Sequence, residues 1–134
     1  MITLAFVNSR PIVKITGFGY VNSPTGDPQP DGIFRGSTTY TVNLHNYGTA
    51  VAHLTGSSLS VSSNAVCVPG NLLDLSGIDI AVGGNNPSPI TLTCSYDHPV
   101  GPITATLVVK YTTNGHQYTA SGSPASITFN VNPD

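Results

Sequence analysis

Apolar and polar residues alternate with a period of two along most of this chain, in short runs separated by Gly, Pro and Asn. This period is typical of β-strands that bury one face, and no stretch of ten or more residues keeps the 3.6-residue apolar period of a helix. The alternation therefore predicts an all-β fold, an antiparallel β-sandwich of two sheets in preference to a barrel. The expected strands are residues 2–7, 12–21, 38–45, 50–54, 58–62, 78–82, 90–96, 103–112, 117–120 and 126–131.

The same alternation predicts which side chains form the core. Three strands have inward sets, which are Tyr40, Val42 and Leu44, then Ala105, Leu107, Val109 and Tyr111, and then Ile127, Phe129 and Val131. Residues 12–21 differ because both of their faces carry apolar side chains. We expect Val13, Ile15 and Val21 to face the core and Phe18 and Tyr20 to point away from it, which predicts an exposed aromatic patch.

Turn residues lie between the expected strands. Asn114-Gly115 supplies two residues that tolerate positive φ, which predicts a tight hairpin joining Tyr111 to Tyr118. Residues 46–49, Asn-Tyr-Gly-Thr, are expected to form a second such connection. Residues 22–32 contain three prolines, so we expect a long exposed loop there.

Two cysteines, Cys67 and Cys94, permit one disulfide. Cys94 shares a strand face with Ile90 and Leu92, so its thiol is expected to point into the core. A bridge joining the two across the core would add about 3–4 kcal/mol of stability and would indicate an oxidising setting or a hyperthermophile source. Two buried free thiols are the alternative.

Charge is scarce. Only 7% of the 134 residues are charged, Glu is missing and the formal net charge is −2. A chain of this length fits one domain, residues 1–134. Without a Lys/Arg cluster we expect no nucleic-acid partner and no anionic membrane surface, and no apolar run is long enough to span a bilayer. With so few acids and bases we expect no enzyme, no catalytic residue, no metal and no cofactor.

Copper is the sharpest alternative chemistry, because blue-copper proteins are β-sandwiches that bind the metal with two imidazoles and a thiolate. Cys94, His98 and the earlier His45 loosely match that pattern. The axial thioether is missing, however, since Met1 is the only methionine. A disulfide to Cys67 would also remove the thiolate.

Several phrases of the sequence resemble one family. Residues 5–15 (AFVNSRPIVKI) resemble the junction between the N-terminal helix and the head of archaeal type IV pilin-like proteins, and residues 46–49, 90–94 and 113–115 resemble strand and turn phrases of those heads. The family includes archaellins and archaellum accessory proteins. The resemblance implies an immunoglobulin-like β-sandwich and an extracellular structural role. The family's long hydrophobic helix is missing from this sequence, so we expect a trimmed head or a relative that assembles by another route.

The resulting hypothesis is a non-enzymatic structural subunit of an extracellular surface assembly, such as a pilus, thread or archaellum-associated protein. Its expected partners are copies of itself and S-layer or capsid proteins. The alternatives are a virion structural protein, such as a capsid decoration or turret subunit, and a cupredoxin-like electron carrier. Residues 1–9 are expected to be either an ordinary first strand or linker, or a strand that inserts beside a neighbour. The expected self-association residues are Ile2, Leu4, Phe6, Phe18 and Tyr20.

Overall fold

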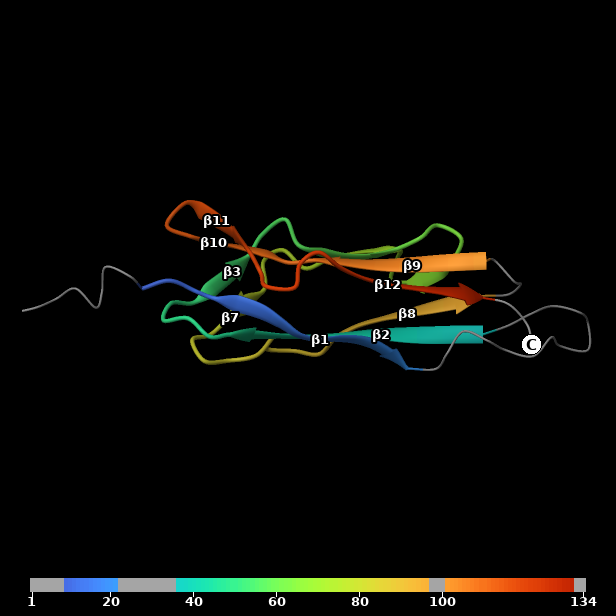
Figure 1. Ribbon diagram of the computed structural model, residues 1–134, viewed down its shortest axis with the longest axis horizontal. Coiled ribbons are helices and arrows are strands. Elements are labelled where there is room, and N and C mark those ends of the chain that lie inside the picture. The colour runs from blue at the N-terminus through green and yellow to red at the C-terminus, as the bar shows by residue number, and fades with distance from the viewer. Residues whose placement is uncertain (1–8, 22–35, 97–100, 132–134) are drawn as a thin grey trace, which may run out of the picture.

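The computed structural model describes residues 9–21, 36–96 and 101–131, and these residues form strands and no helix. The strands are antiparallel in every sheet pairing (Figure 1). They are β1 (Val13–Val21), β2 (Gly36–Asn46), β3 (Ala52–Leu54), β4 (Ser58–Val61), β5 (Val66–Val68), β6 (Leu72–Asp74), β7 (Asp79–Ile80), β8 (Ile90–Tyr96), β9 (Gly101–Val108), β10 (Lys110–Thr113), β11 (His116–Thr119) and β12 (Ala125–Val131). The predicted all-β fold is confirmed.

The strands form three four-stranded sheets. Sheet 1 has the order β1-β2-β8-β5, sheet 2 the order β12-β9-β4-β6 and sheet 3 the order β11-β10-β3-β7. Sheets 1 and 2 face each other in two layers, and sheet 3 continues from sheet 2 because β10 follows β9 along the chain (Figure 1). The sequence therefore predicted the sandwich-like layering but not the third sheet.

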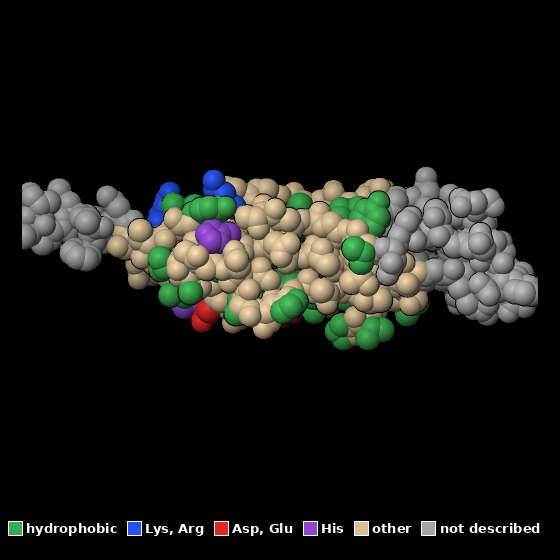
Figure 2. Space-filling model, turned by 90° about the horizontal axis from the view of Figure 1, so that it is seen from below, with side chains coloured by type: hydrophobic (Ala, Val, Ile, Leu, Met, Phe, Trp, Pro, Cys, Tyr) green, Lys and Arg blue, Asp and Glu red, His purple; other side chains and the backbone are tan. Residues whose placement is uncertain are grey.

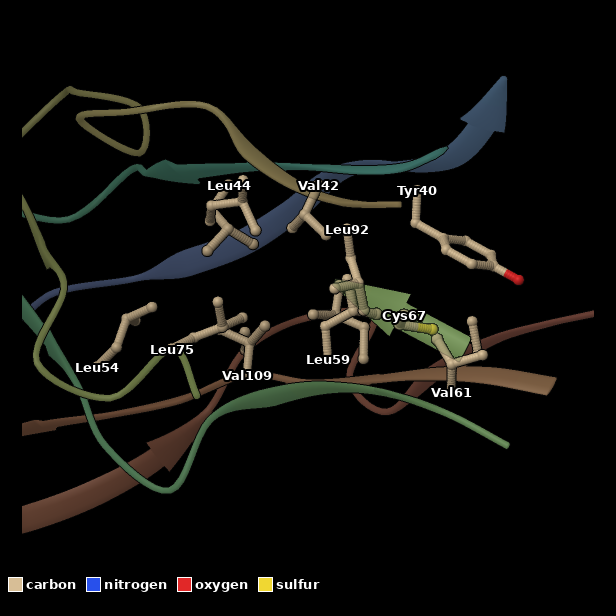
Figure 3. Packing of buried hydrophobic residues seen from close by; sticks show 14 of the residues in the cluster. Tyr40, Val42, Leu44, Leu54, Leu59, Val61, Cys67, Leu75, Leu92 and Val109 are labelled. Carbon is tan, nitrogen blue, oxygen red and sulfur yellow. The ribbon is translucent and has the colours of Figure 1, made fainter. Parts of the chain in front are cut away.

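Buried apolar side chains from both layers form one cluster. Tyr40, Val42 and Leu44 of β2 point from sheet 1 toward Leu59 and Val109 on the opposite side (Figure 3). The inward sets predicted for residues 40–44 and 105–111 are all buried, and Ile127 is partly buried against the cluster. The side chains of Phe129 and Val131 lie outside the described residues.

Where β9 passes into β10, a serine side chain bonds the backbone in place of a neighbouring strand. The predicted single strand 103–112 is interrupted at Val109. The buried Ser57 hydroxyl accepts a hydrogen bond from the Lys110 N–H and donates one to the Lys110 carbonyl, both at 2.8 Å. The Val109 N–H donates to Ser123 Oγ at 2.9 Å. Hydroxyls therefore satisfy backbone groups that the ladder leaves open at the break.

Asn46, which is fully buried at the end of β2, fixes the chain at one end of the molecule. Its Oδ1 accepts from the N–H groups of Ile12 and Gly48, and its Nδ2 donates to the carbonyls of Ala50 and Ile80. All four hydrogen-bonding positions of the amide are used.

The predicted hairpin at Asn114-Gly115 is confirmed, with both residues at positive φ and Tyr111 paired with Tyr118. The prediction of a second tight hairpin at residues 46–49 was wrong. This segment continues along residues 10–12, with hydrogen bonds from Tyr47 N to Ile12 O and from Thr49 N to Arg10 O, before the chain passes from sheet 1 to sheet 3.

β1 carries a β-bulge that reverses the predicted orientation of its second half. Ile15 pairs with Leu44 and Gly17 with Asn43, so Thr16 is the extra residue. Because side chains alternate, one inserted residue moves every later side chain to the other face. Phe18 therefore packs against the core, and Val21 is exposed. The expectation that Val21 faces the core and Phe18 points away from it was wrong.

The predicted disulfide between Cys67 and Cys94 is present, with both side chains buried. It joins directly paired residues of β5 and β8, which are neighbours in sheet 1. The expectation of a bridge across the core was therefore wrong. The strand β5 itself, like β6, was not predicted, and the predicted strand 2–7 and loop 22–32 fall outside the described residues.

Candidate functional site

Over β2 and β8, the outward face of sheet 1 carries a field of uncharged hydroxyl groups. Cross-strand register places three hydroxyl pairs in rows, and the middle row is joined by a 3.0 Å hydrogen bond between Thr39 Oγ1 and Thr93 Oγ1. We call this surface the hydroxyl face. On the face drawn in Figure 2, most of the described surface has the colour shared by the backbone and by side chains that are neither charged nor hydrophobic. The pairs are Ser37 with Ser95, Thr39 with Thr93, and Thr41 with Thr91.

Cations and rings lie together at the end of sheet 1 where β1 begins. Lys14 Nζ lies 5.1 Å from the centroid of the Tyr47 ring, and the Arg10 guanidinium lies 5.8 Å from that of Tyr118. The His45 ring meets Tyr47 edge-on, with centroids 4.3 Å apart, and its Nδ1 lies 2.6 Å from Asn85 Oδ1. These cations stack on aromatic faces and do not form a nucleophile–base arrangement.

A shallow hollow of about 530 Å³ lies beside the bulge. Its lining is wholly uncharged. Asn86 is fixed there, since its Oδ1 accepts from the Leu44 N–H and its Nδ2 donates to the Ser88 carbonyl. Such a lining can exchange hydrogen bonds with neutral polar groups but offers no acid or base. It consists of Thr16, Asn43, Asn85, Asn86, Pro87, Ser88 and Pro89.

The edge strands β1 and β12 border the two layers on one side, where no other strand of the described residues pairs with them, and we call this side the seam. Phe18 and Tyr20 pair with the core residues Val42 and Tyr40, so they belong to the inward face of sheet 1. Phe18 and Ile127 are only partly buried there, and Tyr20 is 44% exposed. The seam thus presents apolar side chains at the margin of the core.

Sequence reasoning missed an apolar corner on the opposite side. Val66, Val68 and Leu72 are 68%, 72% and 67% exposed on the edge strands β5 and β6. The sequence signal that could have predicted this corner was the triplet Val66-Cys67-Val68. With Cys67 facing inward, the alternation of a strand turns both neighbouring valines outward.

Several reactive side chains among the described residues already have partners. Cys94 is in a disulfide, which withholds the thiolate that a blue-copper site requires. His53 and Asp79 contact each other at 2.7 Å, but both are more than half exposed. Within residues 9–21, 36–96 and 101–131, no three His, Cys, Asp or Glu side chains gather as a metal site. These described residues also contain no helix that is long and apolar enough to cross a membrane.

The structure brings two of the predicted self-association residues, Phe18 and Tyr20, together on the seam side of β1. Ile2, Leu4 and Phe6 lie outside the described residues, as does His98. The roles of the five predicted self-association residues in contacts between copies stay predictions.

No protein-family model matches this chain, and no curated protein matches it either.

Proposed function

We propose that this chain is a non-enzymatic structural subunit of an extracellular surface assembly, built by self-association of an immunoglobulin-like sandwich. The hydroxyl face carries the proposal. Its three hydroxyl pairs present donors and acceptors without charge, so a second surface can pack on it with little electrostatic cost. A surface dominated by like charges would instead repel its own copies.

The disulfide supports an extracellular location. Structural disulfides persist in oxidising compartments, and the bridge of Cys67 to Cys94 ties the short edge strand β5 to β8. Hydroxyl and amide side chains support the structural role as well, because Ser57 and Asn46 bond backbone groups of their own chain.

Within this proposal, we assign the chain to the heads of archaeal pilin-like and archaellin-like surface proteins. The support is the resemblance of residues 5–15, 46–49, 90–94 and 113–115 to that family, together with the antiparallel layers. S-layer proteins are the proposed neighbours of the assembly.

Negative-stain electron microscopy of the oxidised full-length chain tests the function. We expect ordered assemblies, filaments or regular oligomers, at micromolar concentration. Particles of single-chain size throughout would contradict a self-associating subunit. A hydrolase or redox activity lost on mutation of one histidine, such as His53→Ala, would contradict the non-enzymatic role.

A further inference from the structure

We propose that the seam between β1 and β12 is an acceptor groove for residues 2–7 of a second copy of this chain. The inserted segment would add an apolar strand to this side of the sandwich. This inference rests on the proposed self-association and names the contact that would produce it.

The acceptor side is defined by two edge strands. β1 ends sheet 1 and β12 ends sheet 2 on the same side of the molecule, where the isolated parallel bridge of Lys14 with Ser121 joins the two layers. Ile127 of β12 pairs with the buried Ala105, so it faces the core as Phe18 does from β1. Both side chains are partly buried and in contact with the core. An added strand would finish their burial and satisfy the edge backbone.

The seam is closed at one end. Ser121 accepts a hydrogen bond from the Ile15 N–H and donates its own N–H to the Val13 carbonyl. A Cβ placed on Gly122 would lie 3.5 Å from Ile15 Cβ, which is ordinary packing distance. The segment around Ser121 therefore occupies the edge of β1 up to Ile15, and beyond the bulge no strand of the described residues pairs with this edge.

Residues 2–7 have the pattern that this edge requires. Ile2, Leu4 and Phe6 alternate with Thr3 and Ala5, so one strand face carries the three large apolar side chains. Six extended residues span roughly 20 Å. This length matches residues 17–21 of β1 and the seven residues of β12.

The molecule's own residues 2–7 cannot reach the same place by a tight turn. A strand that returned along β1 through a two-residue turn at residues 8–9 would set residue 7 beside residue 10 and residue 2 beside residue 15. Arg10 already pairs with Thr49, and Ser121 holds the edge at Val13 and Ile15. A strand returning by that turn would therefore end before Gly17, whereas the same segment of another copy is not tied to residue 8.

Donor and acceptor are different surfaces of the chain, so the contact is heterologous. Each copy gives residues 2–7 to one neighbour and receives the same segment from another. Such a contact builds an open filament when its rotation does not close a ring.

Cysteine cross-linking between two full-length variants tests the seam. A tagged Leu4→Cys protein is mixed with an untagged Tyr20→Cys protein and oxidised with diamide. The control acceptor is Leu72→Cys, on the exposed edge strand β6 away from the seam. Ile127→Cys is a second acceptor on the other wall, and urea unfolding checks that each variant is folded.

We expect the tagged heterodimer band with Tyr20→Cys or Ile127→Cys to be several-fold stronger than with Leu72→Cys. Equal bands for all acceptors, or none, from proteins that still assemble under the microscope would overturn the seam and leave the structural role intact. Absence of both cross-links and assemblies, in the parent chain as well, would overturn the proposed function itself.

Discussion

At the scale of single residues, neutral polar side chains hold backbone segments together. Asn46 joins the chain before β1, the turn after β2 and the end of β7 through four hydrogen bonds. Ser57 bonds both backbone groups of Lys110. This use of amides and hydroxyls explains how a chain with so little charge pairs backbone groups where the strand ladders end.

Asn46→Ala should lower the free energy of unfolding by more than about 3 kcal/mol, because it leaves several buried backbone groups unpaired. Urea unfolding measures the loss, with an unchanged m value indicating that the unfolding transition is otherwise the same. Asn43→Ala is the matched control, since Asn43 is exposed, and it should change stability by less than about 0.5 kcal/mol. Equal effects of the two substitutions would refute the role of Asn46.

Gly48 is required by close backbone approach. A Cβ at this position would lie 2.2 Å from the Arg10 carbonyl oxygen. Gly48→Ala should therefore cost about 1–3 kcal/mol as the segment 10–12 is pushed away. Gly19→Ala serves as the control, because nothing lies within 4 Å of a Cβ there. Thermal unfolding of the two variants should separate them, and a Gly48→Ala protein as stable as the parent would contradict the contact.

At the scale of elements, the bulge in β1 decides which side chains line the seam. Deleting Thr16 alone removes the extra residue and leaves Phe18 opposite Val42, so Phe18 should stay inward. Deleting Gly17 as well would set Phe18 directly after Ile15 and turn it outward, at a cost of about 1–2 kcal/mol of apolar burial. Thr16→Ala keeps the residue count and should leave stability within about 0.5 kcal/mol of the parent. If the double deletion unfolds at the same urea concentration as the deletion of Thr16 alone, the residue count before Phe18 does not set the orientation of β1.

The disulfide also acts at the scale of elements, because it joins the strands β5 and β8. It closes a loop with a sequence separation of 27 residues, so reduction should lower stability by about 3.5 kcal/mol on the chain-entropy model. The melting temperature with and without reductant measures this loss. Non-reducing peptide mapping should recover Cys67 linked to Cys94, and two alkylatable thiols in the native protein would contradict the bridge.

The same elements show what the sequence could predict. Long strands with one apolar face, such as β2 and β8, were predicted because their period of two is sustained. The bulge was not, since residues 12–21 carry apolar side chains on both faces and either orientation satisfies the pattern. β5 was missed because its outward residues, Val66 and Val68, are the apolar ones.

The sequence predicted the neutral character of the candidate site but not which residues lie together in it. Scarce charge and frequent Ser and Thr indicated a neutral surface, and Cys94 was expected to face inward. The pairing of Thr39 with Thr93 depends on the register between β2 and β8, which are separated by much of the chain. No turn joins these two strands, so turn chemistry in the sequence could not predict their register.

At the scale of the whole molecule, the hydroxyl face should be sensitive to charge. Thr91→Lys places an ammonium group in this field, and copies packed through the face would have to bury it or move apart. We expect weaker association on size-exclusion chromatography with an unchanged β spectrum. Gln117→Lys, on the exposed face of the edge strand β11, is the matched control and should associate as the parent does. Equal elution of both variants would exclude the hydroxyl face as the contact.

Sedimentation velocity of the oxidised full-length chain over a concentration series tests self-association most directly. The account predicts that the weight-average sedimentation coefficient rises with concentration toward species of several chains. A single species with the mass of one chain, 13.8 kDa, at every concentration would contradict it.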